Sequence, residues 1–155
     1  MSYYYGQELL GWEQEFEDVV SDLTDSRKRL KALKDLVASG KVSKITYDKL
    51  VGELNRRLLI AEEQRRVLLA KLNEMKAEIE KQSSILGKLI EFTELRFGSG
   101  EISEDYYEKV STALKYGLDE SNRVLGSLQE ATKKLEELAP TYTELDVEGL
   151  MRVDE

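Results

Sequence analysis

The chain has 155 residues, of which 35% are charged and 41% hydrophobic, and its net charge is -8. Histidine and cysteine are absent, which excludes thiol and imidazole nucleophiles, disulfides and the usual zinc ligands. No apolar run approaches the ~20 residues of a membrane-spanning helix, and the N-terminal residues lack the features of a secretory signal. We therefore expect a soluble, cytoplasmic protein without cofactors, and the single proline favours long helices over sheet.

The first predicted helix covers residues 7–38. Apolar side chains recur there at alternating steps of three and four residues, as in the seam of a coiled coil. The seam residues are Leu9, Trp12, Phe16, Val19, Leu23, Ser26, Leu30, Leu33 and Val37. The pattern stops at Gly40, a residue type that readily adopts the left-handed conformation found at helix ends.

The second predicted helix covers residues 44–97. Its seam residues are Tyr47, Leu50, Leu54, Leu58, Ala61, Arg65, Leu68, Leu72, Met75, Ile79, Gln82, Leu86, Leu89 and Thr93. Gly52 and Gly87 each weaken a helix by ~1 kcal/mol, so a bend at either position stays open. The apolar stripe widens at residues 58–60 and 67–69, which we interpret as contact with two neighbouring helices.

The third predicted helix covers residues 103–138 and ends before Pro140. Its seam residues are Tyr107, Val110, Leu114, Gly117, Ser121, Val124, Leu128, Ala131, Leu135 and Leu138. The small residues Gly117 and Ser121 either permit a close approach of two helices or mark the least stable stretch. Residues 140–155 show no helical period, and we interpret them as a flexible C-terminal tail after a helical domain of residues 1–139.

Two similar segments separate these helices: SGKVSKITYDKL begins at Ser39 and SGEISEDYYEKV begins at Ser99. We interpret each as a helix-reversal cassette, in which a glycine turns the chain, a serine caps the next helix and a tyrosine starts its seam. Short connections make neighbouring helices antiparallel. The predicted fold is therefore all-α, an elongated antiparallel coiled coil of three long helices in two overlapping hairpins. The cassette residues are Gly40, Ser43 and Tyr47, and Gly100, Ser103 and Tyr107.

Basic side chains cluster around the first cassette. Between positions 27 and 57 there are ten basic and three acidic residues, a net charge of +7, which leaves -15 for the remainder. Residues 91–109, around the second cassette, carry -4. The ten basic residues are Arg27, Lys28, Arg29, Lys31, Lys34, Lys41, Lys44, Lys49, Arg56 and Arg57.

Three interpretations of this basic end remain open. It could dock on an anionic surface such as lipid headgroups or DNA, it could meet the acidic end of another copy in a filament, or it could be a solvated charged face. DNA is the weakest of these candidates because the chain has no base-reading motif.

Apolar side chains outside the seams favour a homodimer or larger assembly over a monomer. We expect four of them to be incompletely covered, although they could instead broaden a monomeric core: Leu36, Val51, Ile85 and Ile90.

The tail and the carboxylates complete the candidate sites. An apolar segment among acidic residues, formed by Leu145, Val147, Leu150, Met151 and Val153, suits a short linear motif that binds a partner, and an ordinary disordered end is the alternative. Paired carboxylates such as Glu62 and Glu63 lie on a solvated helix surface without the burial that acid–base catalysis requires. We expect no enzymatic activity and no metal site.

The segments RLKALKDLVASGKVSKITYDKLVGEL and ELRFGSGEISEDYYEKVSTAL, with the third seam, resemble the coiled-coil domain of the CdvA family of archaeal cell-division proteins over residues 25–138. The resemblance implies a non-enzymatic scaffold that forms filaments, associates with membrane or DNA and recruits an ESCRT-III-like partner through a short C-terminal segment. The sequence has only MSYYYGQELLGWEQEF where the family has a small β-barrel, so functions of that part are not carried over. A helical subunit of an unrelated complex remains the alternative.

Overall fold

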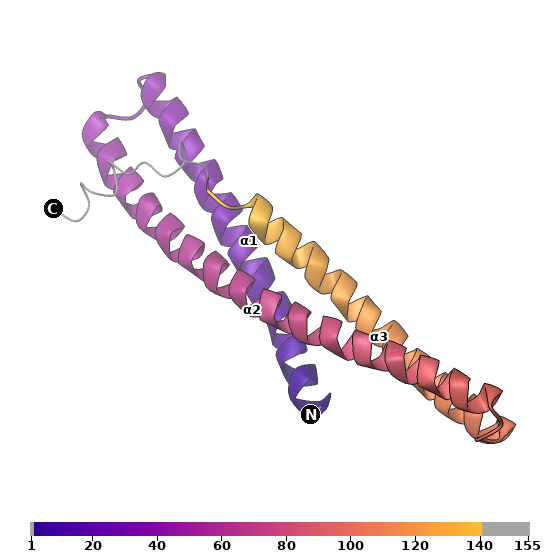
Figure 1. Ribbon diagram of the computed structural model, residues 1–155. Helices are drawn as coiled ribbons and strands as arrows, with labels where there is room; N and C mark the ends of the chain where they lie inside the picture. Colours follow the sequence, from indigo (N-terminus) through magenta and orange to yellow (C-terminus); the bar gives the residue numbers. More distant parts are fainter. Residues whose placement is uncertain (1, 141–155) are drawn as a thin grey trace. The chain divides into compact units, whose positions relative to one another are not determined.

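Three long helices make up the part of the chain that the computed structural model describes, which is residues 2–140, with side chains from residue 11 (Figure 1). They are α1 (Ser2–Ala38), α2 (Lys44–Gly98) and α3 (Glu104–Glu137), and residues 2–140 contain no strand. The predicted all-α class with three helices is thereby confirmed. The helix ends fall within one residue of the predicted ones, except that α1 begins five residues earlier. The expected tail from residue 141 onward lies outside the described residues.

The helices form two compact units. In the first unit, which holds the described residues up to Ala70 and those from Lys134, α1 and the start of α2 form an antiparallel hairpin against which the end of α3 packs (Figure 1). In the second unit, Lys71–Lys133, the rest of α2 and most of α3 form another hairpin. Helix α2 is unbroken at both Gly52 and Gly87.

The two hairpin turns share one backbone geometry. Gly40 and Gly100 have φ angles of 75° and 82°, in the left-handed region. The N–H of Gly40 donates to the carbonyl of Val37 at 3.0 Å, and the N–H of Lys41 donates to the carbonyl of Leu36 at 3.0 Å. This pair of bonds is the Schellman motif that closes a helix C-terminus. The same two bonds recur 3.1 and 2.9 Å long at the second turn, with Phe97 and Arg96 as acceptors.

A serine then caps the helix that follows each turn. The Ser43 hydroxyl accepts a hydrogen bond from the N–H of Thr46 at 3.3 Å, and the Ser103 hydroxyl accepts one from the N–H of Tyr106 at 3.2 Å. Each bond satisfies one of the free N–H groups that every helix N-terminus presents. The repeated sequence segment therefore forms the same hydrogen bonds at both turns, a Schellman motif followed by a serine cap.

The core of the first unit consists of seam residues from three helix segments. Leu23 of α1, Leu68 of α2 and Leu135 of α3 are almost completely buried. Further buried members of this core are Trp12, Val19, Leu30, Leu54 and Ala61. All eight occupy predicted seam positions, while the side chain of Leu9 lies outside the described residues.

In the second unit Gly117 of α3 faces Leu86 of α2 across the seam. A Cβ added to Gly117 of α3 would lie 3.6 Å from the side chain of Leu86 of α2. This is an ordinary van der Waals distance, so an alanine would also fit at this position and the packing does not require glycine. The buried side chains of this core include Leu72, Met75 and Ile79 of α2 and Leu128 and Ala131 of α3.

The predicted seam of α2 was wrong at two positions of the second unit. Gln82 is exposed and Leu89 is 44% exposed, whereas Ser83 and Ile90 are half-buried. The helix keeps its alternation by stepping from Ile79 by four residues instead of three. The spacing of apolar residues could not distinguish the two registers. Leu89 and Ile90 are adjacent and both apolar, and the alternatives Gln82 and Ser83 are both polar.

The widened apolar stripe of α2 was also interpreted wrongly in part. Leu59, Ile60 and Val67 are 44%, 60% and 57% exposed, although we had assigned this stripe to contact with two neighbouring helices. The contact with the end of α3 involves Arg65, which belongs to the narrow seam. A set of apolar side chains in the first unit is consequently left on the surface.

Candidate interaction surfaces

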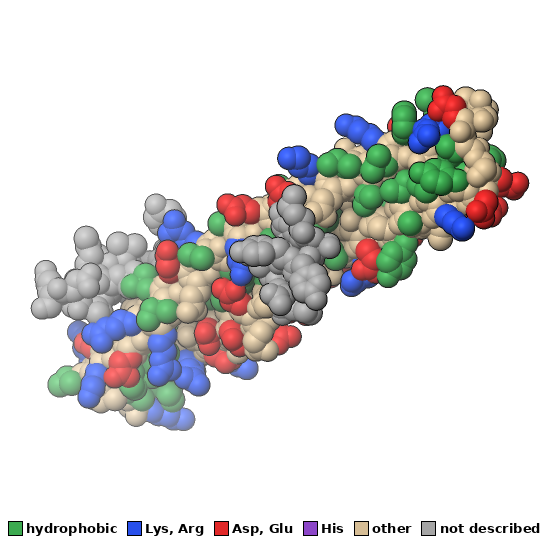
Figure 2. Space-filling model, turned by 90° about the horizontal axis from the view of Figure 1, so that it is seen from below, with side chains coloured by type: hydrophobic (Ala, Val, Ile, Leu, Met, Phe, Trp, Pro, Cys, Tyr) green, Lys and Arg blue, Asp and Glu red, His purple; other side chains and the backbone are tan. Residues whose placement is uncertain are grey.

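The first hairpin turn gathers the ten basic residues that the sequence singled out, because α1 and α2 run antiparallel from it. Nine of them are exposed and Arg27 is half-buried. Figure 2 shows Lys and Arg side chains collected around this turn. At least one of these basic residues does not stabilise its own helix. The helix dipole favours negative charge at the N-terminus of α2, yet Lys44 is its first residue and its first turn has no acidic residue.

Arg27 and Arg65 hold the end of α3 against the first hairpin. A guanidinium nitrogen of Arg27 donates to the carbonyl of Leu138 at 2.6 Å, and one of Arg65 donates to the carbonyl of Leu135 at 3.0 Å. Carbonyls in the last turn of a helix have no partner within the helix, so these bonds act as a side-chain cap. Arg27 therefore has a structural contact within the unit.

The buried position of Arg65 depends on a carboxylate beside it. Two guanidinium nitrogens of Arg65 donate to Glu62 at 2.8 and 2.7 Å. The hydrogen bond that Arg65 donates to Glu62 raises the pKa of Arg65 above its ordinary value, although burial acts in the opposite direction. This pairing explains how an arginine occupies a core position of α2 at 7% exposure.

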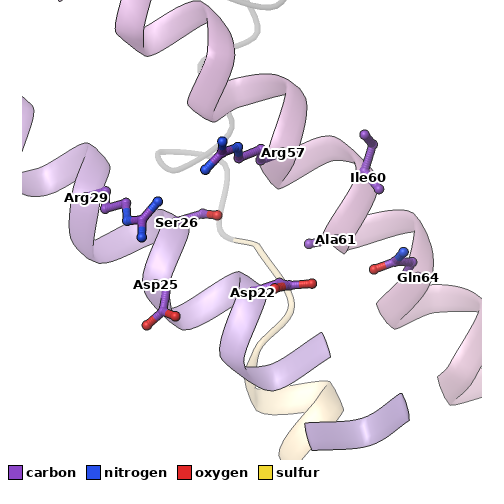
Figure 3. A pocket seen from close by; sticks show the side chains of 8 residues that line it. All are labelled: Asp22, Asp25, Ser26, Arg29, Arg57, Ile60, Ala61 and Gln64. Atoms are coloured by element: carbon purple, nitrogen blue, oxygen red, sulfur yellow. The ribbon is translucent and has the colours of Figure 1, made fainter. Parts of the chain in front are cut away.

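A groove runs between α1 and α2 in the first unit (Figure 3). One part of it, about 400 Å³, includes Asp22, Arg29, Arg57 and Ile60 in its lining. Figure 3 shows Arg29 and Arg57 extending from opposite walls, one from each helix. The sequence analysis included both arginines in the basic cluster but did not predict that they face each other. Pairing α1 with α2 in antiparallel order around Gly40 would have predicted it.

A second part of the groove is more apolar. It measures about 350 Å³ and shares Arg29 and Arg57 with the first part. Its other lining residues are Ala32, Leu33, Leu36, Leu50, Glu53 and Leu54. The groove as a whole therefore has an apolar floor with mixed charges around it, Arg29 and Arg57 with Asp22, Asp25 and Glu53.

The second hairpin turn has the same backbone geometry as the first but different side chains. The rings of Phe97 and Tyr107 stack at 4.2 Å, and the Tyr107 hydroxyl donates to Glu94. That hydrogen bond is the main reason why the pKa of Tyr107 is raised. Arg96 pairs with Glu101 at 3.4 Å. Acidic side chains surround this turn in Figure 2.

Large apolar side chains form an exposed row on α2 in the second unit. Ile85, Leu89 and Phe92 are 50%, 44% and 56% exposed, and their spacing of four and three residues places them on one face. Leu95, beside this row, is also exposed. Figure 2 shows hydrophobic side chains gathered on the surface of this unit. The sequence identified only Ile85, although the same spacing rule would have found the others.

The four side chains that we expected to be incompletely covered differ in exposure. Leu36 and Ile85 are exposed, while Val51 and Ile90 are half-buried. The predicted partner-binding residues of the tail, from Leu145 to Val153, lie outside the described residues. The cassette residues Ser43 and Ser103 are at the turns, and Tyr47 and Tyr107 are half-buried beside them.

A family model for the CdvA-like coiled-coil domain matches residues 11–152. The match covers both reversal cassettes and all three helices from residue 11. The chain belongs to the CdvA-like coiled-coil family. Neither a curated protein nor a solved structure matches the sequence.

Membership of the CdvA-like family makes the chain a coiled-coil protein related to cell division. The family is a structural scaffold family that is not known for enzymatic activity. Among the described residues, no group of three or more acidic side chains could hold a metal ion. No helix within residues 2–140 has an apolar stretch long enough to cross a lipid bilayer.

Proposed function

We propose that this CdvA-like chain is a non-enzymatic scaffold that self-associates and recruits an ESCRT-III-like partner during cell division. The observation that carries the proposal is the exposed apolar row of Ile85, Leu89 and Phe92. Apolar side chains at successive turns of one helix face are typical of a surface that a second helix covers. Family membership supports the cell-division role.

Light scattering coupled to size-exclusion chromatography tests the self-association. We expect the full chain to elute as a dimer or larger species, and the double variant Ile85→Glu, Phe92→Glu to elute at a smaller mass. The control variant Glu80→Lys, Glu91→Lys changes charge at exposed positions on another face of the same helix and should keep the mass of the unchanged chain. A monomer before any substitution would refute the proposal.

Recruitment is assigned to the tail, on the basis of its apolar residues among acids. Deleting residues 141–155 should abolish binding of an ESCRT-III-like protein in a pull-down, while circular dichroism shows unchanged helicity. Binding that survives the deletion would remove the tail from the proposal.

A second candidate function is docking on an anionic membrane surface, which would place the protein peripherally at the division site. The supporting observation is that nine basic residues around the first turn are exposed. Sedimentation with vesicles containing phosphatidylserine should weaken steeply with salt and disappear when Lys28, Arg29, Lys31 and Lys34 are changed to glutamate. Gel shifts with duplex DNA, run in parallel, would show whether DNA competes for the same residues.

A further inference from the structure

The exposed apolar row on α2 belongs to a longer seam of the second unit, on which hydrophobic side chains gather in Figure 2. The same alternating steps of three and four residues continue on both sides of the row. This spacing keeps one face of a helix in contact with a second helix. We call the six positions the outer seam of α2: Glu78, Gln82, Ile85, Leu89, Phe92 and Arg96.

The spacing of the outer seam is the same when it is read in either direction. Its six positions form three pairs centred on Gly87, namely Ile85 with Leu89, Gln82 with Phe92, and Glu78 with Arg96. A second copy of α2 that runs antiparallel, with the two Gly87 residues level, therefore meets the seam position for position. An isologous contact requires this kind of self-complementary surface, because both copies contribute the same patch.

The charges at the two ends of the outer seam favour the antiparallel direction. In that arrangement Glu78 lies opposite Arg96 of the second copy, and this contact occurs twice. In a parallel pair each residue would face its own counterpart, so that Glu78 would face Glu78 and Arg96 would face Arg96. Glu78 makes no hydrogen bond or ion pair within the described residues. Arg96 contacts Glu101 at 3.4 Å with 39% of its side chain exposed, and a guanidinium group has donors for a second carboxylate.

The residues that flank the outer seam are compatible with this direction. On one side Leu86 and Thr93 belong to the core of the hairpin itself. On the other side the antiparallel register places Lys81 beside Leu95 of the second copy, whose side chain is 67% exposed and can be covered by the lysine stem. Lys88 lies beside its own counterpart. The pair therefore has one like-charge contact, between exposed lysines, against two opposite-charge contacts at its ends.

The length of α2 sets the extent of this contact. The helix ends at Gly98, eleven residues after Gly87, so the antiparallel overlap begins eleven residues before Gly87, at position 76. The overlap is ~33 Å long at ~1.5 Å per residue. The outer seam fills most of it, with apolar side chains in the middle and charged side chains at both ends.

We propose that two copies of the chain pair through their outer seams in antiparallel order, centred on Gly87. Ile85, Leu89 and Phe92 form the apolar centre, and Glu78 pairs with Arg96 of the other copy at each end. The inference rests on the proposed self-association and adds its direction and register. An isologous contact closes at two copies, so larger assemblies require another surface.

Spin labels on single cysteines test the direction, since the natural chain has no cysteine. Lys88→Cys, Lys81→Cys and Glu74→Cys place labels at exposed positions beside the outer seam, seven residues apart. With ~1.5 Å per residue and helix axes about 10 Å apart, labels of the two copies should lie under about 20 Å apart at position 88 and about 40 Å apart at position 74. Position 81 should give an intermediate distance. A parallel pair would give one distance at all three positions.

Charge exchange tests the register. Glu78→Arg places like charges at both ends of the contact and should raise the dissociation constant of the dimer about tenfold in sedimentation equilibrium. Arg96→Glu should act in the same direction, and the chain that carries both changes should regain the original dissociation constant. Glu80→Arg, at an exposed position on another face of α2, is the matched control and should have no effect. Circular dichroism checks that helicity is unchanged in each variant.

The outcomes separate this inference from the proposed function. A dimer with equal label distances at all three positions, or with the longest distance at position 88, would overturn the antiparallel seam and leave self-association intact. A dimer in which the double charge exchange is weaker than either single change would overturn the register. A chain that is monomeric in light scattering would overturn both proposals.

Discussion

At the scale of single residues, Arg65 shows how a charged side chain can occupy a coiled-coil core. The guanidinium group of Arg65 pairs with Glu62 and also donates a hydrogen bond to the carbonyl of Leu135. The arginine therefore stabilises the end of α3 in addition to filling its own seam position. The sequence placed Arg65 correctly in the seam, but the spacing of apolar residues carries no information about the two acceptors that make its burial tolerable.

Replacing Arg65 by methionine should lower the free energy of unfolding by about 2 kcal/mol, because a charged hydrogen bond to Leu135 is lost and the partly buried Glu62 loses its partner. Urea denaturation followed by circular dichroism measures the change. Arg66→Met is the matched control: its pair with Glu63 is 3.7 Å long and both side chains are exposed, so its effect should stay below about 0.5 kcal/mol. Equal effects of the two variants would contradict the assigned role.

Tyr107 connects stability to alkaline pH. Its pKa is raised in the folded state above the ordinary value of 10.0, mainly by the hydrogen bond to Glu94. The folded state therefore holds the phenolic proton more tightly, so this contribution is fully present below pH 10.0 and is lost as the pH rises through the folded-state pKa. In spectrophotometric titration, Tyr107→Phe should remove a tyrosine that ionises late. If the tyrosine ionisation that Tyr107→Phe removes lies below pH 10.0, the assignment is contradicted.

At the scale of elements, the two reversals were predictable because they depend on local residue types. Glycine, serine and their spacing specify a Schellman motif and an N-cap regardless of the surroundings. The register of α2 beyond Ile79 was not predictable in the same way. It depends on which residues of α3 face it, such as Gly117 opposite Leu86, and neighbouring apolar residues left the choice open.

Alanine substitution at the two turn glycines tests the reversals. Gly40→Ala and Gly100→Ala should each lower the free energy of unfolding by about 1–2 kcal/mol, because a Cβ disfavours the left-handed conformation. Gly87→Ala is the control within a helix. It meets no atom within 4 Å and should raise the free energy of unfolding by up to about 1 kcal/mol, because alanine has the higher helix propensity. Destabilisation by Gly87→Ala with none at the turns would refute this explanation.

At the scale of the whole molecule, the surfaces argue for function through contact. Each unit exposes apolar side chains of α2, and the first unit adds a groove with two arginines. Family membership gives the setting of cell division. The sequence predicted the basic cluster and the need for assembly, but it could not predict the groove, because a groove arises from how side chains of two helices meet.

Apolar and charge-driven association differ in their response to salt. Burial of Ile85, Leu89 and Phe92 is insensitive to ionic strength, whereas contact between the basic and acidic ends is screened within ~8 Å at physiological salt. We expect a stable small oligomer at high salt and larger species at low salt. The charge-reversed Arg29→Glu, Arg57→Glu chain should keep the former and lose the latter in sedimentation velocity. Complete dissociation at high salt would show that charge alone drives assembly.

The measurement that tests the central claim most directly is the solution mass of the unmodified chain by light scattering, taken over a range of concentrations and salt. The account predicts a mass of at least two copies of the 17.8 kDa chain at micromolar concentration and at every salt concentration. A constant mass of one copy under all these conditions would contradict it.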